Sequence, residues 1–324
     1  MPLNGKTILV TGGTGSFGQK FIKTILERFK PKKLIVFSRD ELKQFEMSQE
    51  FLQTSKEGGV RYFLGDVRDI DRLRRAFDGV DIIVHAAALK QIPACEYNPF
   101  EAVKTNILGT QNVVDASIDC GVEKVLALST DKAVSPVNLY GGTKLCAEKL
   151  VVHGNLYSRK GKTIMSCARY GNVMGSRGSV VLLFLEQRKK GKITVTDPRM
   201  TRFFITLEQG IDFIINCLQT MNGGEVFVPK IPSMRIMDLV EAIAPGCEVE
   251  TIGVRPGEKI HELLISQDES RSAYDTGGMY VILPSFYEEN QNIPGDAKRV
   301  PDDFTFSSDA NEDWLSVEQL RDLV

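Results

Sequence analysis

The chain has 324 residues and a formal net charge of −2 at pH 7. This length suits one large α/β domain, or a large and a small one that share a cleft. The near balance of charge, with an isoelectric point of about 6.1, argues against a nucleic-acid footprint or an anionic membrane partner. Any anion-binding site must therefore be local.

Targeting and cysteine signals are absent from the sequence. The N-terminal residues lead from MPLNGK directly into a strand-like TILV, without the long apolar segment of a signal peptide. No run of 18 apolar residues occurs. The six cysteines are scattered and form no CxxC pair, so neither a disulfide framework nor a metal site is expected. These features predict a soluble cytoplasmic protein.

The first half of the chain alternates apolar runs with stretches of helical periodicity. Strands are predicted at 7–10, 34–37, 61–65, 81–87, 124–129 and 163–170. Helices are predicted between them at 18–29, 70–77, 99–118 and 139–152. Continuous apolar strands joined by helices are typical of a parallel sheet covered on both faces. We therefore predict an α/β fold with a Rossmann-type doubly wound parallel sheet.

The regular alternation of predicted strands and helices ends after Gly175. Helical segments are predicted at 180–190, 206–219 and 236–243, and short strands at 192–196, 225–230 and 249–253. We predict a Rossmann domain over residues 1–175 and a smaller substrate-binding portion over 176–284, packed over the carboxyl edge of the sheet. The tail, 285–324, is rich in Asp, Glu, Asn and Pro and is expected to be loosely structured, with a closing helix within 312–324.

A glycine-rich turn follows the first predicted strand. ILVTGGTGSFG places Gly12, Gly15 and Gly18 where this strand turns into the first helix. Small residues let the backbone approach a pyrophosphate, and the helix N-terminus supplies N–H groups and the positive end of its dipole. This context predicts a dinucleotide site. The other contacts predicted in the turn are Thr14, Ser16 and Phe17.

The end of the second strand decides the choice of cofactor. VFSRDELK places Ser38 and Arg39 at the tip, where an NAD site would need a carboxylate for the ribose. A hydroxyl and a guanidinium suit a 2′-phosphate, so NADP is favoured. Asp40 lies one residue further, and a small shift would put it on the ribose instead. The remaining predicted cofactor contacts are Lys43, Asp66, Val67, Ala86, Lys90, Tyr140, Lys144 and Val173.

Proton-handling side chains gather between residues 130 and 144. Tyr140 and Lys144 are four residues apart and would share one face of a helix. A neighbouring ammonium favours the phenolate, so the tyrosine could remove a hydroxyl proton while hydride leaves the same carbon for a nicotinamide. The segment before them adds Thr130 and an adjacent acid and base, Asp131 and Lys132. The alternative is that Asp131 and Lys132 form a surface ion pair at the end of a strand.

These motifs resemble a known family. TGGTGSFG, HAAALK, LSTDK and YGGTK together are similar to the extended short-chain dehydrogenases/reductases. The resemblance covers about 280 residues and includes the distal blocks RYGNVMGSRGSVV, DPRMTRFFI, VPKIPSMRI and RPGEKIHE. Those blocks are most similar to the inverting UDP-N-acetylglucosamine 4,6-dehydratases, which open pseudaminic acid biosynthesis. The resemblance implies an NADP-dependent lyase and a homo-oligomer.

The resemblance also implies roles for individual residues. Oxidation at carbon 4 precedes the loss of water across carbons 5 and 6, with Lys132 as the base at carbon 5 and Asp131 as the acid on the departing hydroxyl. Asp131 must then hold a proton, and burial together with Lys144 must lower the pKa of Lys132. Retaining relatives usually carry Asp-Glu here, so the lysine favours inversion at carbon 5. The implied contacts to UDP-N-acetylglucosamine are Lys90, Lys132, Asn172, Arg177, Arg202, Arg255 and Glu258, for each of which a solvated surface position is the alternative.

Several other polar residues have structural explanations. His85 in a predicted strand and His261 in a predicted helix are expected to be structural. Asn106 is expected to be a satisfied core amide and Asp69 a helix cap. Ser135 departs from the family pattern, in which relatives carry Asn at this position.

Two other functions stay open beside the inverting dehydratase and its retaining counterpart. A nucleotide-sugar 4-epimerase would perform the same oxidation with Thr130, Tyr140 and Lys144, but Asp131 and Lys132 would remain unexplained. A redox-sensing or scaffolding protein that binds NADP without turnover would tolerate the loss of the Tyr-Lys pair, which this chain retains.

Overall fold

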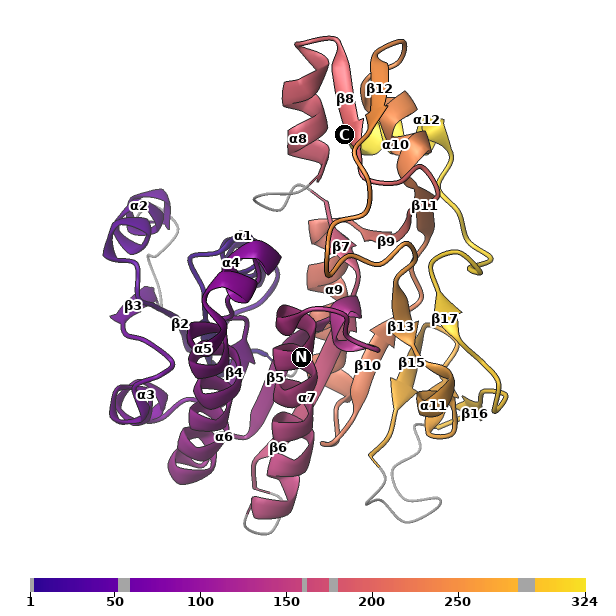
Figure 1. The fold of residues 1–324 in the computed structure, drawn as a ribbon. Coiled ribbons are helices and arrows are strands. Elements are labelled where there is room, and N and C mark those ends of the chain that lie inside the picture. The colour runs from indigo at the N-terminus through magenta and orange to yellow at the C-terminus, as the bar shows by residue number, and fades with distance from the viewer. Residues whose placement is uncertain (1–2, 52–58, 159–161, 175–179, 285–294) are drawn as a thin grey trace.

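A central sheet organises the molecule (Figure 1). The structure is a computed structural model that describes residues 3–51, 59–158, 162–174, 180–284 and 295–324. The strands of the sheet are β1 (Thr7–Thr11), β2 (Lys33–Ser38), β3 (Val60–Leu64), β4 (Ile82–His85), β5 (Lys124–Thr130), β6 (Ile164–Tyr170), β10 (Val226–Pro229), β14 (Ala273–Asp275), β15 (Met279–Ile282) and β16 (Lys298–Arg299). Their order is β16-β14-β15-β10-β6-β5-β4-β1-β2-β3.

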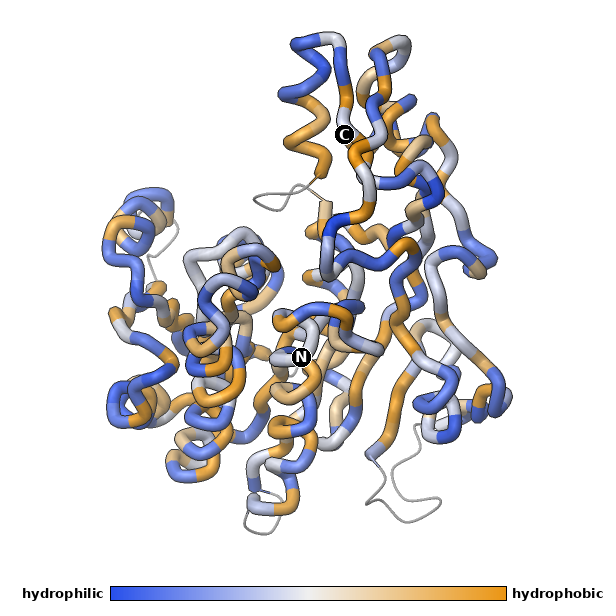
Figure 2. The backbone as a smooth tube through the Cα atoms, viewed as in Figure 1, coloured by the Kyte–Doolittle hydropathy of each residue, from blue (hydrophilic) through white to orange (hydrophobic). Residues whose placement is uncertain are grey.

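The sheet is parallel from β10 to β3 and antiparallel at the other edge, where β15, β14 and β16 pair. Strands buried on both faces need continuous apolar residues, and β1 illustrates this with Ile8, Leu9 and Val10, all fully buried. Apolar residues accordingly follow the inner strands, whereas hydrophilic residues predominate at the outer surfaces of the helices (Figure 2). The predicted Rossmann-type doubly wound sheet is confirmed.

Helices cover the sheet. They are α1 (Ser16–Arg28), α2 (Glu41–Phe51), α3 (Ile70–Phe77), α4 (Ile92–Tyr97), α5 (Pro99–Ala102), the π-helical turn η1 (Val103–Leu108), α6 (Gly109–Cys120), the 3₁₀ turn η2 (Asp131–Ala133), α7 (Leu139–Tyr157) and α9 (Leu207–Thr220). One group consists of α3, α6 and α7, which pack side by side, and α1 packs against α9. All six strands and all four helices predicted in the first half are present, although the predicted helix 99–118 is divided into α5, η1 and α6.

A smaller portion stands beside the carboxyl ends of the parallel strands (Figure 1). Its elements are β7 (Asn172–Val173), α8 (Val180–Arg188), β8 (Lys192–Val195), β9 (Thr201–Ile205), β11 (Ser233–Arg235), α10 (Ile236–Ile243), β12 (Glu248–Thr251) and α12 (Val317–Leu323). It has an apolar core of its own, which includes Phe184, Ile193, Leu239 and Leu320. Three further elements, β13 (Leu263–Ile265), α11 (Gln267–Ser270) and β17 (Phe306–Ser307), lie beside the antiparallel edge of the large sheet, and β13 and β17 share its apolar core.

The second half of the chain contributes to both portions. Strands β10, β14, β15 and β16 all come after residue 175 and join the large sheet, so this sheet is not confined to residues 1–175. The expectation of a loosely structured tail is wrong for residues 295–324, because they supply β16, β17 and α12 and bury Ser308 and Leu320 completely. The predicted closing helix is confirmed as α12. No helix in the described ranges is long and apolar enough to cross a membrane.

Candidate active site

A cavity of about 700 Å³ lies at the carboxyl ends of the parallel strands. Its lining comes from the turns after β1, β2, β3, β4 and β5, from α7, and from β7 and α8 of the smaller portion. Every residue predicted as catalytic lines this cavity, as do all of the predicted cofactor contacts except Gly18. The structure therefore brings these side chains together, and their individual roles remain predictions.

The glycine-rich turn between β1 and α1 forms one wall. Gly12 has a φ of 66°, and a Cβ atom there would lie 2.9 Å from the backbone of Ala87, so a side chain would be strained and would clash. Gly18 has a packing role, because a Cβ atom would lie 2.4 Å from the carbonyl oxygen of Gly13. No side chain caps the first turn of α1, where Ser16 and Phe17 line the cavity. This arrangement suits a pyrophosphate.

The far end of the cavity is rich in charge. The Ser38 hydroxyl accepts a hydrogen bond from Gln44 at 3.1 Å, and Arg39 lies 3.6 Å from Asp66 in an ion pair. Asp40 forms an ion pair with Lys43. A hydroxyl, a guanidinium and an ammonium thus line this end, a donor set that fits a phosphate group.

The predicted acid and base follow β5 directly. The hydroxyl of Thr130 donates to Asp131 Oδ1 at 2.8 Å, and Lys132 Nζ donates to the same oxygen at 3.0 Å. Asp131 is completely buried, and its Oδ2 has no hydrogen-bond partner among the described residues. The pair therefore lines the cavity and is not the surface ion pair that the sequence also allowed.

Helix α7 presents Tyr140 and Lys144 to the cavity. Asn138 caps this helix by accepting a hydrogen bond from the backbone N–H of Gly141 at 2.8 Å. A Cβ atom on Gly141 would lie 2.1 Å from the carbonyl oxygen of Lys132, so this glycine permits the close approach of α7 to η2. Lys144 is 6% exposed and donates to the Leu128 carbonyl at 2.7 Å, and burial lowers its pKa.

The surroundings of Tyr140 disfavour the expected phenolate. Burial raises the pKa of Tyr140 to about 12, and this outweighs the charge of Lys132 and a hydrogen bond with Thr130, which both lower it. The phenol is therefore the stable form at neutral pH. Any base at this position must be generated by further positive charge in the cavity.

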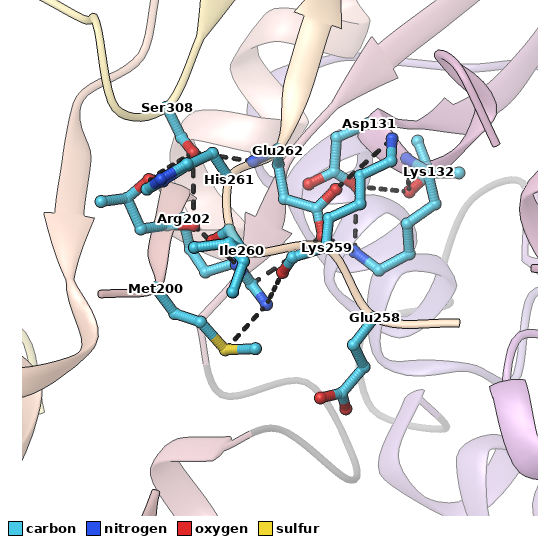
Figure 3. A network of polar contacts seen from close by, with 12 residues as sticks. Asp131, Lys132, Met200, Arg202, Glu258, Lys259, Ile260, His261, Glu262 and Ser308 are labelled. Carbon is cyan, nitrogen blue, oxygen red and sulfur yellow. Dashed lines mark hydrogen bonds and ion pairs between the residues drawn. The ribbon is translucent and has the colours of Figure 1, made fainter. Parts of the chain in front are cut away.

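Lys132 also differs from expectation. Burial lowers its pKa, but the charges of Asp131 and Glu262 act more strongly together and raise it above the usual range. Its Nζ lies 3.5 Å from Glu262 Oε1 (Figure 3), a contact that the expectation did not include. The prediction that the pKa of Lys132 is lowered is wrong, because the buried carboxylates of Asp131 and Glu262 lie beside the ammonium.

The predicted substrate contacts separate into two groups. Lys90, Lys132 and Asn172 line the cavity. Arg202 is not among the described lining residues, and it donates to the carbonyls of Thr201 and Ile260 at 2.7 and 2.9 Å. The other predicted contacts away from the described lining are Arg255, which is exposed and 3.9 Å from Glu258, and Glu258 itself. Arg177 lies outside the described residues.

The structural explanations for other polar residues hold in most cases. His85 lies 2.7 Å from the Thr11 hydroxyl, and burial lowers its pKa to about 3, so it is neutral. Asn106 donates to the Leu89 carbonyl at 2.8 Å, and Asp69 caps α3. His261 is in a loop and not in the predicted helix.

Sequence reasoning missed Glu262, which precedes β13. The block RPGEKIHE, in which it is the last residue, resembles the family, yet nothing in the sequence places this glutamate beside Lys132. Its position depends on the pairing of β13 with β17, and β13 in turn contacts η2.

Comparison with known proteins places the chain in a family. Residues 8–284 match the family described as "Polysaccharide biosynthesis protein". The chain is 50% identical over 330 aligned residues to the UDP-N-acetylglucosamine 4,6-dehydratase (inverting) of Campylobacter jejuni subsp. jejuni serotype O:23/36 (strain 81-176), which spans 99% of this chain and 98% of the relative. It is 43% identical over 289 residues to the UDP-glucose 4-epimerase of Rickettsia prowazekii (strain Madrid E), which spans 86% of this chain and 82% of the relative.

A solved structure agrees with this assignment. The X-ray structure of Pen from Bacillus thuringiensis superimposes with a TM-score of 0.90 at 41% identity, covering 100% of this chain and 98% of Pen. The similarity thus extends over both portions of the molecule and includes the cavity between them. The chain belongs to the polysaccharide biosynthesis protein family, within the extended short-chain dehydrogenases/reductases.

Proposed function

We propose that this protein is an NADP-dependent UDP-N-acetylglucosamine 4,6-dehydratase, a lyase that inverts the configuration at carbon 5. The observation that carries the proposal is the ion pair of buried Asp131 with partly exposed Lys132, which lines the same cavity as Tyr140 and Lys144. A 4-epimerase needs no acid and base for an elimination. The relative that is 50% identical over nearly the whole chain also supports the dehydratase over the epimerase, whose identity is 43%.

The cavity fits a dinucleotide. The turn at Gly12 and Gly15 and the first turn of α1 would hold the pyrophosphate, and Ser38 and Arg39 would hold a 2′-phosphate. A bound nicotinamide would supply the hydride acceptor for carbon 4 and the hydride donor for carbon 6, so the reaction would involve no net oxidation. Residues 1–175 would supply most of the cofactor contacts, and the segment 176–284 would help to enclose the sugar.

Tyr140 would accept the proton of the carbon 4 hydroxyl. The charge of Lys132 and the hydrogen bond with Thr130 lower the pKa of Tyr140 but do not offset burial, so the positive charge of a bound nicotinamide would be needed to form the phenolate. Lys144, one turn further along the same face of α7, holds its ammonium on the carbonyl of Leu128. The ketone formed at carbon 4 then acidifies the hydrogen on carbon 5.

Asp131 and Lys132 would perform the elimination. Transfer of one proton from Lys132 Nζ to Asp131 Oδ1, across 3.0 Å, produces an amine and a carboxylic acid together. The amine removes the proton from carbon 5, and the acid protonates the hydroxyl that leaves carbon 6 as water. Return of the Lys132 proton would invert this centre if the sugar ring first turned to present the opposite face of carbon 5 to the ammonium.

Thr130 would carry a proton from Tyr140 back to Asp131 after the elimination. After the elimination Asp131 lacks the proton that left with water, and Tyr140 holds the proton of the carbon 4 hydroxyl. Thr130 donates to Asp131 at 2.8 Å and also forms a hydrogen bond with Tyr140. It thus links the two groups, and a proton can return from Tyr140 to Asp131 through its hydroxyl.

Proton NMR of the purified protein with UDP-N-acetylglucosamine in deuterated water tests this proposal. Loss of water with a new methyl signal is expected, and the coupling pattern should report inversion at carbon 5. Interconversion at carbon 4 without a methyl signal would mean an epimerase. An unchanged spectrum would favour a protein that binds the cofactor without turnover.

The family resemblance supports a homo-oligomer that supplies pseudaminic acid biosynthesis, and the sequence features described above support a cytoplasmic location. Light scattering of the purified protein measures the assembly, and a mass equal to a single chain would contradict it.

A further inference from the structure

Glu262 is a buried carboxylate that the proposed steps do not use. It is 2% exposed, immediately precedes β13 and lies beside Asp131 and Lys132 (Figure 3). Its backbone N–H donates to the Ser308 hydroxyl at 2.9 Å, and its carbonyl accepts from the Ser308 N–H at 2.8 Å. These two bonds fix the main chain at Glu262.

Three cations surround this carboxylate, although none forms a hydrogen bond with it. Glu262 Oε1 lies 3.5 Å from Lys132 Nζ and 3.8 Å from Arg202 Nε, and Oε2 lies 3.9 Å from Lys259 Nζ. Arg202 and Lys259 donate elsewhere, to carbonyl groups that include those of Ile260 and Val134. Oε2 has no hydrogen-bond partner among the described residues. A buried carboxylate held in this way is costly for stability and calls for a functional explanation.

We propose that Glu262 is a positioning residue for Lys132, whose ammonium its carboxylate holds against Asp131. This inference rests on the proposed function, in which Lys132 is the base at carbon 5. The groups that face Glu262 are Asp131 and Lys132 from η2, Arg202 from β9 and Lys259 from its own loop. Burial and the charge of Asp131 raise the pKa of Glu262, whereas Lys132, Arg202 and Lys259 oppose this and favour its anion. When Lys132 passes its proton to Asp131, this carboxylate lies beside the amine. It therefore stabilises the ammonium that forms again when the amine takes the proton from carbon 5.

Titration of Lys132 in a Glu262→Gln variant tests the contact directly. Lysines labelled with ¹³C at the ε carbon are followed by NMR, and the Lys132 signal is assigned by its loss in Lys132→Arg. Removal of the anion, with Arg202 and Lys259 still present, should lower the pKa of Lys132 by about 1–3 units. An unchanged Lys132 titration would overturn the proposal.

Asp309→Asn is the matched control. Asp309 lies next to Ser308 and pairs with Ser307, so the variant removes a carboxylate from the same region without changing the contacts of Lys132. The Lys132 titration should stay as in the unchanged protein. A shift as large as that in Glu262→Gln would overturn the proposal, because it would mean that any nearby carboxylate has this effect.

The reaction supplies a second readout. In Glu262→Gln, the rise of the water-elimination rate with pH should move to lower pH in step with the Lys132 titration, and a profile that stays in place would overturn the role in elimination. Glu262→Asp keeps the negative charge, but its shorter side chain moves the carboxylate away from Lys132. The rate of water elimination should therefore fall about 10-fold or more, while the rate of formation of reduced nicotinamide should change less than about two-fold. Equal losses in both steps would contradict the proposal. Failure of the unchanged protein to eliminate water would refute the proposed function, and the lysine titration would still decide the role of Glu262.

Discussion

Tyr140 must lose its proton in surroundings that favour the phenol. Burial raises its pKa to about 12, and only Lys132 and Thr130 among its neighbours act against this. The oxidation at carbon 4 therefore depends on the positive charge that gathers around the sugar. This makes the phenol oxygen, and not the ring, the feature that the reaction requires.

Tyr140→Phe tests this requirement. The variant keeps the ring and loses the hydroxyl, so formation of reduced nicotinamide from UDP-N-acetylglucosamine should fall by about 10²–10⁴-fold. Stopped-flow absorbance measures this step, and circular dichroism checks that the fold is unchanged. A rate close to that of the unchanged protein would show that another group takes the hydroxyl proton.

Ser135 has a strained backbone between η2 and α7. Its φ is 43°, and it is the only described residue other than glycine with a positive φ. Asn adopts this left-handed conformation more readily than Ser. The structure thus gives a physical reason for the Asn that the family resemblance implies at this position.

Ser135→Asn should stabilise the protein by about 0.5–1 kcal/mol, because it relieves part of this strain. Ser135→Val, with a β-branched side chain, should be destabilising by a similar amount or more. Urea denaturation of both variants measures the free energies of unfolding. Equal stabilities for Asn and Val would show that the left-handed backbone carries no strain.

Single residues were predictable where their roles follow from local motifs. Asp131, Lys132, Tyr140 and Lys144 lie within one short segment, so the order of strand and helix is enough to place them on one cavity. The charge state of Lys132 was not predictable, because Glu262 reaches it from a distant part of the chain.

Among the elements, the tip of β2 and the start of α2 carry the choice between NADP and NAD. Arg39 is more than half exposed and lines the cavity, but Asp66 pairs with it at 3.6 Å. Burial raises the pKa of Asp66, yet the hydrogen bonds from Arg68 outweigh this and lower it overall, so Asp66 is ionised. A 2′-phosphate would compete with this carboxylate for the guanidinium of Arg39.

Arg39→Ala tests the preference for NADP. The affinity for NADP should fall by about 10–100-fold, while the affinity for NAD should change little, because only NADP carries the phosphate. Isothermal titration calorimetry with both cofactors measures this difference. The control is Arg68→Ala, since Arg68 also pairs with Asp66 but is not among the described lining residues. Equal losses for the two cofactors in Arg39→Ala would contradict the assignment.

The helices and strands that could be predicted from the sequence are those whose apolar residues recur with a clear period. The six strands of the first half are buried runs that the sequence shows clearly. Helix α2 was not predicted, because its apolar residues do not follow one face. Met47 and Phe51 are buried in the core together with the polar Gln44, whereas Leu42 and Phe45 are exposed. The π-helical turn η1 was also not predictable, since Val103–Leu108 continues the helical pattern on both sides.

At the scale of the whole molecule, a buried ion cluster joins elements from distant parts of the chain. Arg169 in β6 is 1% exposed and donates to Glu148 of α7 at 2.7 Å and to Glu269 of α11 at 2.8 Å. It also donates to the carbonyl of Leu264 in β13 at 2.9 Å. The cluster thus ties β13, which Glu262 precedes, to the helix that carries Tyr140.

Arg169→Met should destabilise the protein by about 3–5 kcal/mol at neutral pH, because it leaves buried carboxylates without a cation. Burial raises the pKa of Glu269, but Arg169 outweighs this and lowers it overall, so in the unchanged protein its contribution to stability is present above the unfolded pKa and is lost as pH falls. The penalty in Arg169→Met should therefore shrink toward acid pH. Urea denaturation across pH measures it, and a penalty that is independent of pH would contradict this explanation.

The division of the chain was the least predictable feature at this scale. The loss of regular strand–helix alternation after Gly175 indicates the smaller portion, which has its own core around Phe184 and Leu239. Composition alone could not show that later strands return to the large sheet or that the tail packs as β17 and α12, because these pairings join residues far apart in sequence.

The assignment as a dehydratase is tested most directly by Lys132→Ala with UDP-N-acetylglucosamine. Absorbance follows reduced nicotinamide, and proton NMR follows the methyl group that forms only after water is lost. Reduced nicotinamide should still form, while the rate of methyl formation should fall by about 100-fold or more. Methyl formation at the rate of the unchanged protein would show that Lys132 is not the base and would contradict the proposed elimination.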